Sequence, residues 1–184
     1  GHAVILSAHS GGGARLSSLL EQGKKPVKPA GLKSLLLFDS INAKKKDNGN
    51  PDVDGSTELR RIRAFVSFQL DLELKELDKL TKLSNGATDP DQDQIRKRQI
   101  KYLEQSGFRV RGYYTPGWYA QIYAPLVKDI ADWFKKQSSL DTKVVESWSK
   151  NYVVQSVNAV SKVGPVGKGH QGHDYILGQG TPAG

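Results

Sequence analysis

The stretch that decides the fold is Ala3-Val4-Ile5-Leu6-Ser7-Ala8-His9-Ser10-Gly11-Gly12-Gly13, which is followed directly by Ala14-Arg15-Leu16-Ser17-Ser18-Leu19-Leu20. A short apolar run that ends in small residues is typical of a buried strand, and the leucine spacing after the glycines is typical of a helix. The stretch therefore predicts a strand at residues 3–8, a sharp turn at Ser10 and a helix that begins near residue 14.

The residue types around Ser10 are those that such a turn requires. A serine at the tip of a strand-to-helix turn has a strained backbone, and the residues two before and two after it face each other, so both must be small. Ala8 and Gly12 meet this condition. The turn would expose the Ser10 hydroxyl and would aim the N–H of Gly11, at the start of the helix, at an oxygen that gains negative charge.

The pattern around Ser10 reads A-x-S-x-G, which differs by one methyl group from the G-x-S-x-G of a nucleophile elbow. The alternative is an ordinary glycine-rich loop or a phosphate loop. A phosphate loop needs Gly-Lys followed by Ser or Thr, and a dinucleotide site needs G-x-G-x-x-G. The segment contains neither motif.

The rest of the chain alternates strand and helix patterns. Further strands are predicted near residues 33–39, 108–114 and 151–157, and helices at residues 57–83, 90–107 and 118–136. This alternation predicts an α/β domain with a mostly parallel sheet, right-handed crossovers and helices on both faces.

Length and composition limit the class of protein. A chain of 184 residues is long enough for one domain with a core of its own, and it contains no cysteine. Its net charge of +8 comes from scattered clusters that are not interleaved with aromatic residues, which argues against a nucleic-acid groove. No apolar run is long enough to cross a bilayer.

Three residue types in order suggest acyl-transfer chemistry. A serine nucleophile needs a base to take its proton, and the base needs an acid to orient it. Ser10 follows the first strand, Asp39 follows the second, and a histidine follows the last. His173 precedes Asp174-Tyr175-Ile176-Leu177, an expected helix start, and is the predicted base; His170 is the alternative base. The two histidines lack a third metal ligand, so no metal and no cofactor is predicted.

The chain resembles the C-terminal half of an α/β hydrolase, from the nucleophile strand to the histidine loop, on the motifs Ala8-His9-Ser10-Gly11-Gly12 and Gly169-His170-Gln171-Gly172-His173-Asp174-Tyr175-Ile176-Leu177. The resemblance implies a serine hydrolase that cleaves an ester or amide through an acyl-enzyme, with Ser10 as nucleophile and Gly11 as an oxyanion-hole donor. Most members of the family place the acid one strand later, where this chain has Tyr114-Thr115-Pro116-Gly117; a lipase-like subset places it where Asp39 lies.

The strands that the family places before the nucleophile are absent from residues 1–184. We therefore expect one partial hydrolase-like domain, whose sheet is completed beside Val4, Ile5 and Leu6 by a second polypeptide or by a preceding segment. An uncovered apolar sheet edge invites such pairing. The alternative is a non-catalytic hydrolase-like module that binds or supports a larger assembly.

Two features bear on the substrate, which would be a small-molecule or polymer acyl compound. Tyr114 and Trp118 lie where the third strand meets its helix, and they are predicted to contact substrate or else to pack against the core. The loop and helical segment at residues 43–106 would either cover the site as a lid or simply pack against the rest of the domain.

Overall fold

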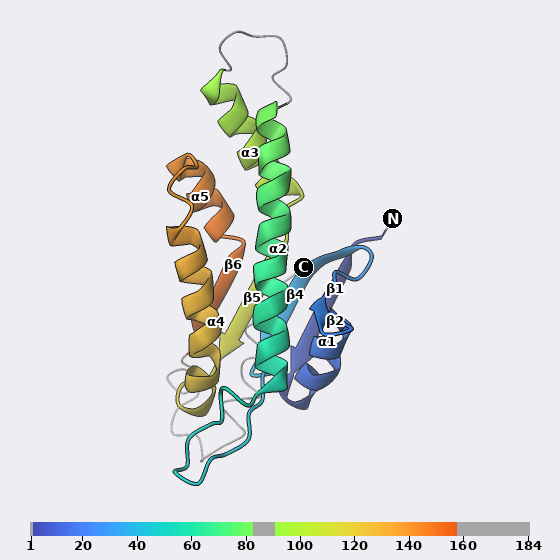
Figure 1. The fold of residues 1–184 in the computed structure, drawn as a ribbon, viewed down its shortest axis with the longest axis vertical. Helices are drawn as coiled ribbons and strands as arrows, with labels where there is room; N and C mark the ends of the chain where they lie inside the picture. The colour runs from blue at the N-terminus through green and yellow to red at the C-terminus, as the bar shows by residue number, and fades with distance from the viewer. Residues whose placement is uncertain (1, 83–90, 158–184) are drawn as a thin grey trace.

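Four parallel strands form the central sheet of the protein (Figure 1). The computed structural model describes residues 2–82 and 91–157. The strands are β1 (Val4–His9), β4 (Leu32–Phe38), β5 (Arg109–Tyr114) and β6 (Tyr152–Ser156), and they lie in the order β1-β4-β5-β6. Every neighbouring pair is parallel, which confirms the predicted α/β class and the predicted parallel sheet.

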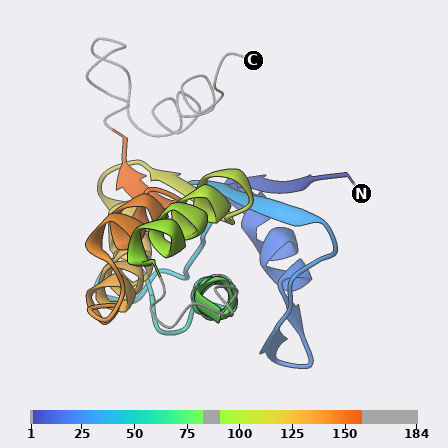
Figure 2. The same cartoon turned by 90° about the horizontal axis from the view of Figure 1, so that it is seen from above.

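The described helices lie on one face of this sheet (Figure 2). They are α1 (Gly13–Leu19), α2 (Thr57–Lys82), α3 (Gln92–Gln105), α4 (Trp118–Lys135) and α5 (Thr142–Ser149). The expectation of helices on both faces is therefore not met within residues 2–82 and 91–157. The strand order explains why: it advances in one direction, and right-handed crossovers that advance in one direction place their helices on one side.

The core lies between the sheet and this helical layer. Alternate residues of β4, Leu35 and Leu37, are fully buried, and they belong to the same core cluster as Ile62 and Phe65 of helix α2, which are also fully buried. Helix α2 is part of the crossover between β4 and β5, so the helical part of the 43–106 segment belongs to the core of the domain. The loop at residues 43–56 lies at the end of the molecule where the strands end (Figure 1).

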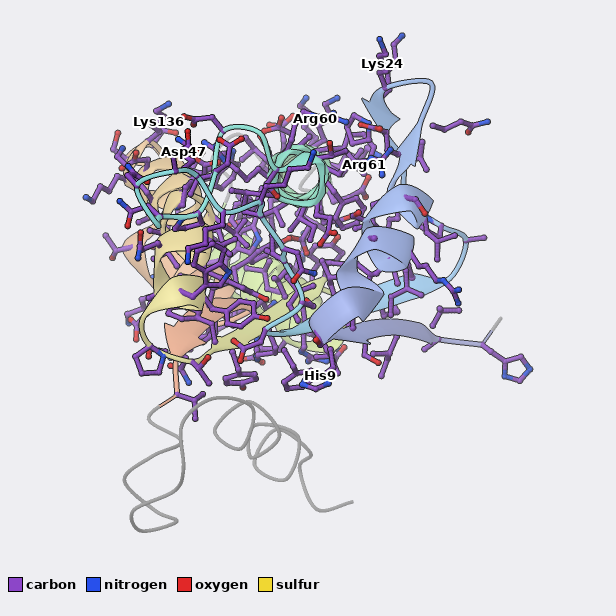
Figure 3. The ribbon with its side chains drawn as sticks, turned by 90° about the horizontal axis from the view of Figure 1, so that it is seen from below. His9, Lys24, Asp47, Arg60, Arg61 and Lys136 are labelled. Carbon is purple, nitrogen blue, oxygen red and sulfur yellow. The ribbon has the colours of Figure 1, made fainter. Side chains whose placement is uncertain are left out.

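A short hairpin projects from the helical layer between α1 and β4. Its strands are β2 (Glu21–Gln22) and β3 (Lys25–Pro26), joined by a two-residue turn. Glu21 accepts hydrogen bonds from Arg60 and Arg61 of α2, and these bonds lower the pKa of Glu21 to about 2. Figure 3 shows both arginines on the helical side of the sheet, with Lys24 at the tip of the hairpin.

Glu73 is a carboxylate in the core, with 1% of its surface exposed. Its Oε1 accepts a hydrogen bond from the backbone N–H of Phe108 at 2.6 Å, and its Oε2 accepts from Trp148 Nε1 at 3.0 Å and from the Tyr152 hydroxyl. One side chain of α2 thus joins the start of β5, α5 and β6. Burial raises the pKa of Glu73 above its ordinary value, although the three hydrogen bonds and the charge of Lys28 oppose this shift.

The raised pKa of Glu73 predicts a pH dependence of stability. Because the folded protein holds the Glu73 proton more tightly than the unfolded chain, this group favours folding below a pH of about 4.5 and loses that contribution as pH rises through the folded-state pKa. Glutamine does not ionise, so Glu73→Gln should not lose stability in this way. We therefore expect the difference in the free energy of unfolding, variant minus wild type, to become more positive as pH rises. Urea unfolding between pH 4 and 7 measures the difference.

The exposed Glu76→Gln on the same helix is the control for the removal of a carboxylate, because Glu76 lies at the surface beside Lys79. Parallel stability curves for wild type and Glu73→Gln over this pH range would contradict the prediction.

Candidate functional site

The turn after β1 has the geometry that its sequence predicts. Strand β1 ends at His9, Ser10 adopts a left-handed backbone with φ of +51°, and Ser10–Gly12 form one 3-10 turn before α1 begins at Gly13. A Cβ built on Gly12 would lie 3.6 Å from the Cβ of Ala8. The predicted strain at Ser10 and the predicted contact between Ala8 and Gly12 are both confirmed.

Two further glycines serve this turn in different ways. Gly11 is exposed, and a Cβ added to it would meet nothing within 4 Å, so the space beside the turn is open. Gly13 is buried, and a Cβ there would lie 1.6 Å from the carbonyl oxygen of Ser40. Only glycine allows the start of α1 to lie against the chain that follows β4.

Asp39 follows β4 as Ser10 follows β1. The two strands are adjacent and parallel, and their last paired residues are His9 and Phe38. Ser10 and Asp39 are therefore the residues that directly follow the last paired positions of two adjacent strands, at the carboxyl edge of the sheet. Asp39 is fully buried and also adopts a left-handed backbone, with φ of +43°.

The carboxylate of Asp39 is held by the loop after β5. The backbone N–H of Thr115 donates to Oδ1 at 2.8 Å, and the Thr115 hydroxyl donates to Oδ2 at 2.9 Å. The N–H of Asp39 itself donates to the carbonyl of Tyr113 at 3.1 Å. Thr115 is a site residue that sequence reasoning missed, since its role depends on β4 and β5 lying side by side.

Ser10 and Asp39 both adopt the left-handed backbone that most non-glycine residues avoid. The third non-glycine residue with positive φ in the described part of the chain is Lys24, and it shares with Gly23 the positive φ that a two-residue hairpin turn requires. Such backbone costs about 1–3 kcal/mol per residue and is concentrated at functional sites. The fold therefore places its two strained strand ends next to each other.

Two tyrosines border this edge, and burial raises the pKa of both phenols. The hydroxyl of Tyr123 accepts a hydrogen bond from the N–H of Ser40 at 3.1 Å, and burial raises the pKa of Tyr123 to about 12. Burial also raises the pKa of Tyr119, with the charges of Asp39 and Glu58 adding to the shift.

Tyr114 and Trp118 pack against the core, which was one of the two roles expected of them. Tyr114 stacks on the buried Tyr123 with ring centroids 5.0 Å apart, and half-buried Trp118 begins α4. The predicted bases, His173 and His170, lie outside the described residues. In the part of the chain that is described, no group of three His, Asp or Glu side chains is placed to hold a metal ion.

His9 precedes Ser10 in sequence but does not face the helical layer. Its side chain points to the opposite face of the sheet, as Figure 3 shows, whereas Ala8 is buried on the helical side. This alternation follows from the two-residue period of a strand. The two sides of β1 near its end therefore differ: one carries the small residue that the turn requires, and the other carries an imidazole.

Comparison with known proteins does not assign the chain to a family. No family model matches it, and no curated protein or solved structure matches it at a significant level. Within residues 2–82 and 91–157, no helix is both long enough and apolar enough to cross a membrane. The function must therefore be inferred from the fold and from the geometry at the carboxyl edge of the sheet.

Proposed function

We propose that the chain is the nucleophile-bearing part of a serine hydrolase with an α/β-hydrolase-like fold, which cleaves an ester or amide through an acyl-enzyme. The observation that carries the proposal is the pair of strained residues at adjacent strand ends. Ser10 and Asp39 have left-handed backbones, follow one rung of a parallel sheet, and are the serine and the acid that the sequence predicts. Backbone of this kind costs free energy and clusters at functional sites, and this supports the proposal.

The proposed chemistry gives each residue one role. Ser10 Oγ attacks the acyl carbon while His173 takes its proton, and the carbonyl oxygen becomes an oxyanion that accepts a hydrogen bond from the N–H of Gly11. The protonated base then gives its proton to the leaving alcohol or amine, and water hydrolyses the acyl-enzyme by the same steps in turn. Asp39, oriented by Thr115, holds the base in the correct tautomer.

One edge of β1 pairs with no strand of the described residues, and this supports a larger assembly. Among the described residues β1 pairs with β4 only, and the edge strand leaves Val4 36% and Ile5 60% exposed. We infer that a further strand, from a second polypeptide or a preceding segment, pairs with this edge and supplies the second oxyanion donor. A non-catalytic module would use the same edge for assembly but would have no need of a reactive Ser10.

Labelling with a fluorophosphonate tests the proposal and separates these two functions. We expect the full-length natural protein to be labelled at Ser10, as shown by peptide mass spectrometry, because only a serine with an adjacent base attacks the probe rapidly. Labelling should slow by orders of magnitude in His173→Ala and only slightly in His170→Ala.

Two outcomes would contradict this expectation. An active esterase labelled at a residue other than Ser10 would remove the assignment of the nucleophile. A folded natural protein that neither hydrolyses activated esters nor reacts with the probe would instead favour the non-catalytic module.

A further inference from the structure

The side-chain amide of Asn42 links the turn at Ser10 to the residue that follows Asp39. Its Nδ2 lies 3.2 Å from the carbonyl oxygen of Ser10 and 3.3 Å from that of Ser40, and both carbonyls accept hydrogen bonds from it. One amide group thus contacts the backbone of the proposed nucleophile and the backbone of the residue after the proposed acid. Asn42 belongs to neither strand, so these bonds add a link that the sheet itself does not provide.

The position of Asn42 is set by the first turn of α2. Glu58 Oε2 accepts a hydrogen bond from the Asn42 backbone N–H at 2.9 Å and lies 3.2 Å from Nδ2, whose two hydrogens are shared among Glu58 and the two carbonyls. The Ser56 hydroxyl donates to the Asn42 carbonyl at 2.5 Å and also accepts from the N–H of Leu59, so it caps the helix. Asn42 precedes the 43–56 loop, while Ser56 and Glu58 stand at its other end, so these bonds close the loop at its base.

We propose that Asn42 is a positioning residue for the hydrolase reaction, which holds the nucleophile turn at a fixed distance from the acid, and that Glu58 holds Asn42 in place. The inference rests on the proposed function. It adds that the base of the 43–56 loop, and not only the sheet, determines where Ser10 lies relative to Asp39. Since a displacement of about 1 Å in a reacting group can cost about 100-fold in rate, a single amide at this place has a large effect.

A structural role and a positioning role can be separated by a pair of substitutions. Asn42→Asp removes the donor to both carbonyls and places a second carboxylate beside Glu58. Adding Glu58→Gln supplies an amide that can donate to the new carboxylate, which restores the link at the base of the loop. The double variant still lacks any side-chain donor from position 42 to the Ser10 carbonyl.

We expect Asn42→Asp to lower both the thermal stability and kcat on an activated ester, with kcat falling about 10- to 100-fold and KM changing little. In Asn42→Asp/Glu58→Gln, the part of the thermal stability that comes from the link at the base of the loop should recover, while kcat and the rate of fluorophosphonate labelling stay low. Asn48→Asp is the matched control, because Asn48 is exposed in the same loop and its Oδ1 accepts a bond that aspartate keeps. The measurements are made on the full-length natural protein.

Recovery of kcat together with stability in the double variant would overturn the proposal, because Asn42 would then serve only to close the loop. An unchanged kcat in Asn42→Asp would overturn it as well. Ser10→Ala is assayed in parallel. If that variant keeps wild-type activity, the proposed function fails first and the role of Asn42 fails with it, whereas loss of activity in Ser10→Ala with normal kcat in Asn42→Asp removes the positioning role alone.

Discussion

The Ser10→Ala variant is expected to lose turnover of an activated ester by a factor on the order of 10⁶ in kcat, the scale on which serine triads depend on their nucleophile. The fold should survive, since serine and alanine carry the same Cβ and bear the same steric cost at a φ of +51°. Turnover of p-nitrophenyl esters and thermal unfolding of the same preparation measure the two effects separately.

Ser18→Ala is the matched control for this loss. Ser18 is exposed on α1, and its hydroxyl donates to the carbonyl of Arg15 within its own helix. Full activity is expected in this variant. If Ser10→Ala retains activity comparable to that of Ser18→Ala, Ser10 is not the nucleophile.

The second large effect is expected at Asp39. Asparagine is isosteric with aspartate, so Asp39→Asn can keep the left-handed backbone and can still accept from the Thr115 N–H through its amide oxygen. It cannot hold a protonated base in place by its charge, so kcat should fall on the order of 10⁴-fold. A pH–rate profile with the activated ester measures the loss across the range in which the base titrates.

Two variants calibrate the result at Asp39. Thr115→Val removes only the hydroxyl bond to Oδ2 and keeps the backbone N–H bond, so a loss of about 10- to 100-fold is expected. Asp47→Asn makes the same chemical change at an exposed position of the 43–56 loop and should leave kcat unchanged. Equal activities in Asp39→Asn and Asp47→Asn would show that Asp39 is not the triad acid.

Local residue patterns were sufficient to predict most of the regular structure. The strand at β1, the turn at Ser10 and helix α2 were predicted because strand alternation, small residues and helical spacing are encoded within a few neighbouring residues. The hairpin of β2 and β3 was missed because its strands have two residues each, which is too short for a pattern. Helix α5 was missed although Asp141 accepts from the N–H of Lys143 as an N-cap and Val144 and Trp148 are spaced for one buried side.

The placement of the helices needed the order of the strands in space. Each right-handed crossover could be predicted from the strand and helix alternation, but the side on which its helix lies depends on the direction in which the sheet grows. In this protein the order β1-β4-β5-β6 grows in one direction, so α1, α2 and α4 share one face (Figure 2). Strand order is a long-range property, and no local pattern contains it.

The sequence by itself determined the local geometry of the turn at Ser10 and the residues proposed to carry the chemistry, because the backbone at Ser10 and the close approach of Ala8 and Gly12 are properties of neighbouring residues. Only the tertiary structure decided which groups support them. Thr115 lies 76 residues from Asp39, and Asn42 lies 32 residues from Ser10. Polar contacts over such separations are created when parallel strands bring their carboxyl ends to one edge, and they leave no periodic signal in the chain.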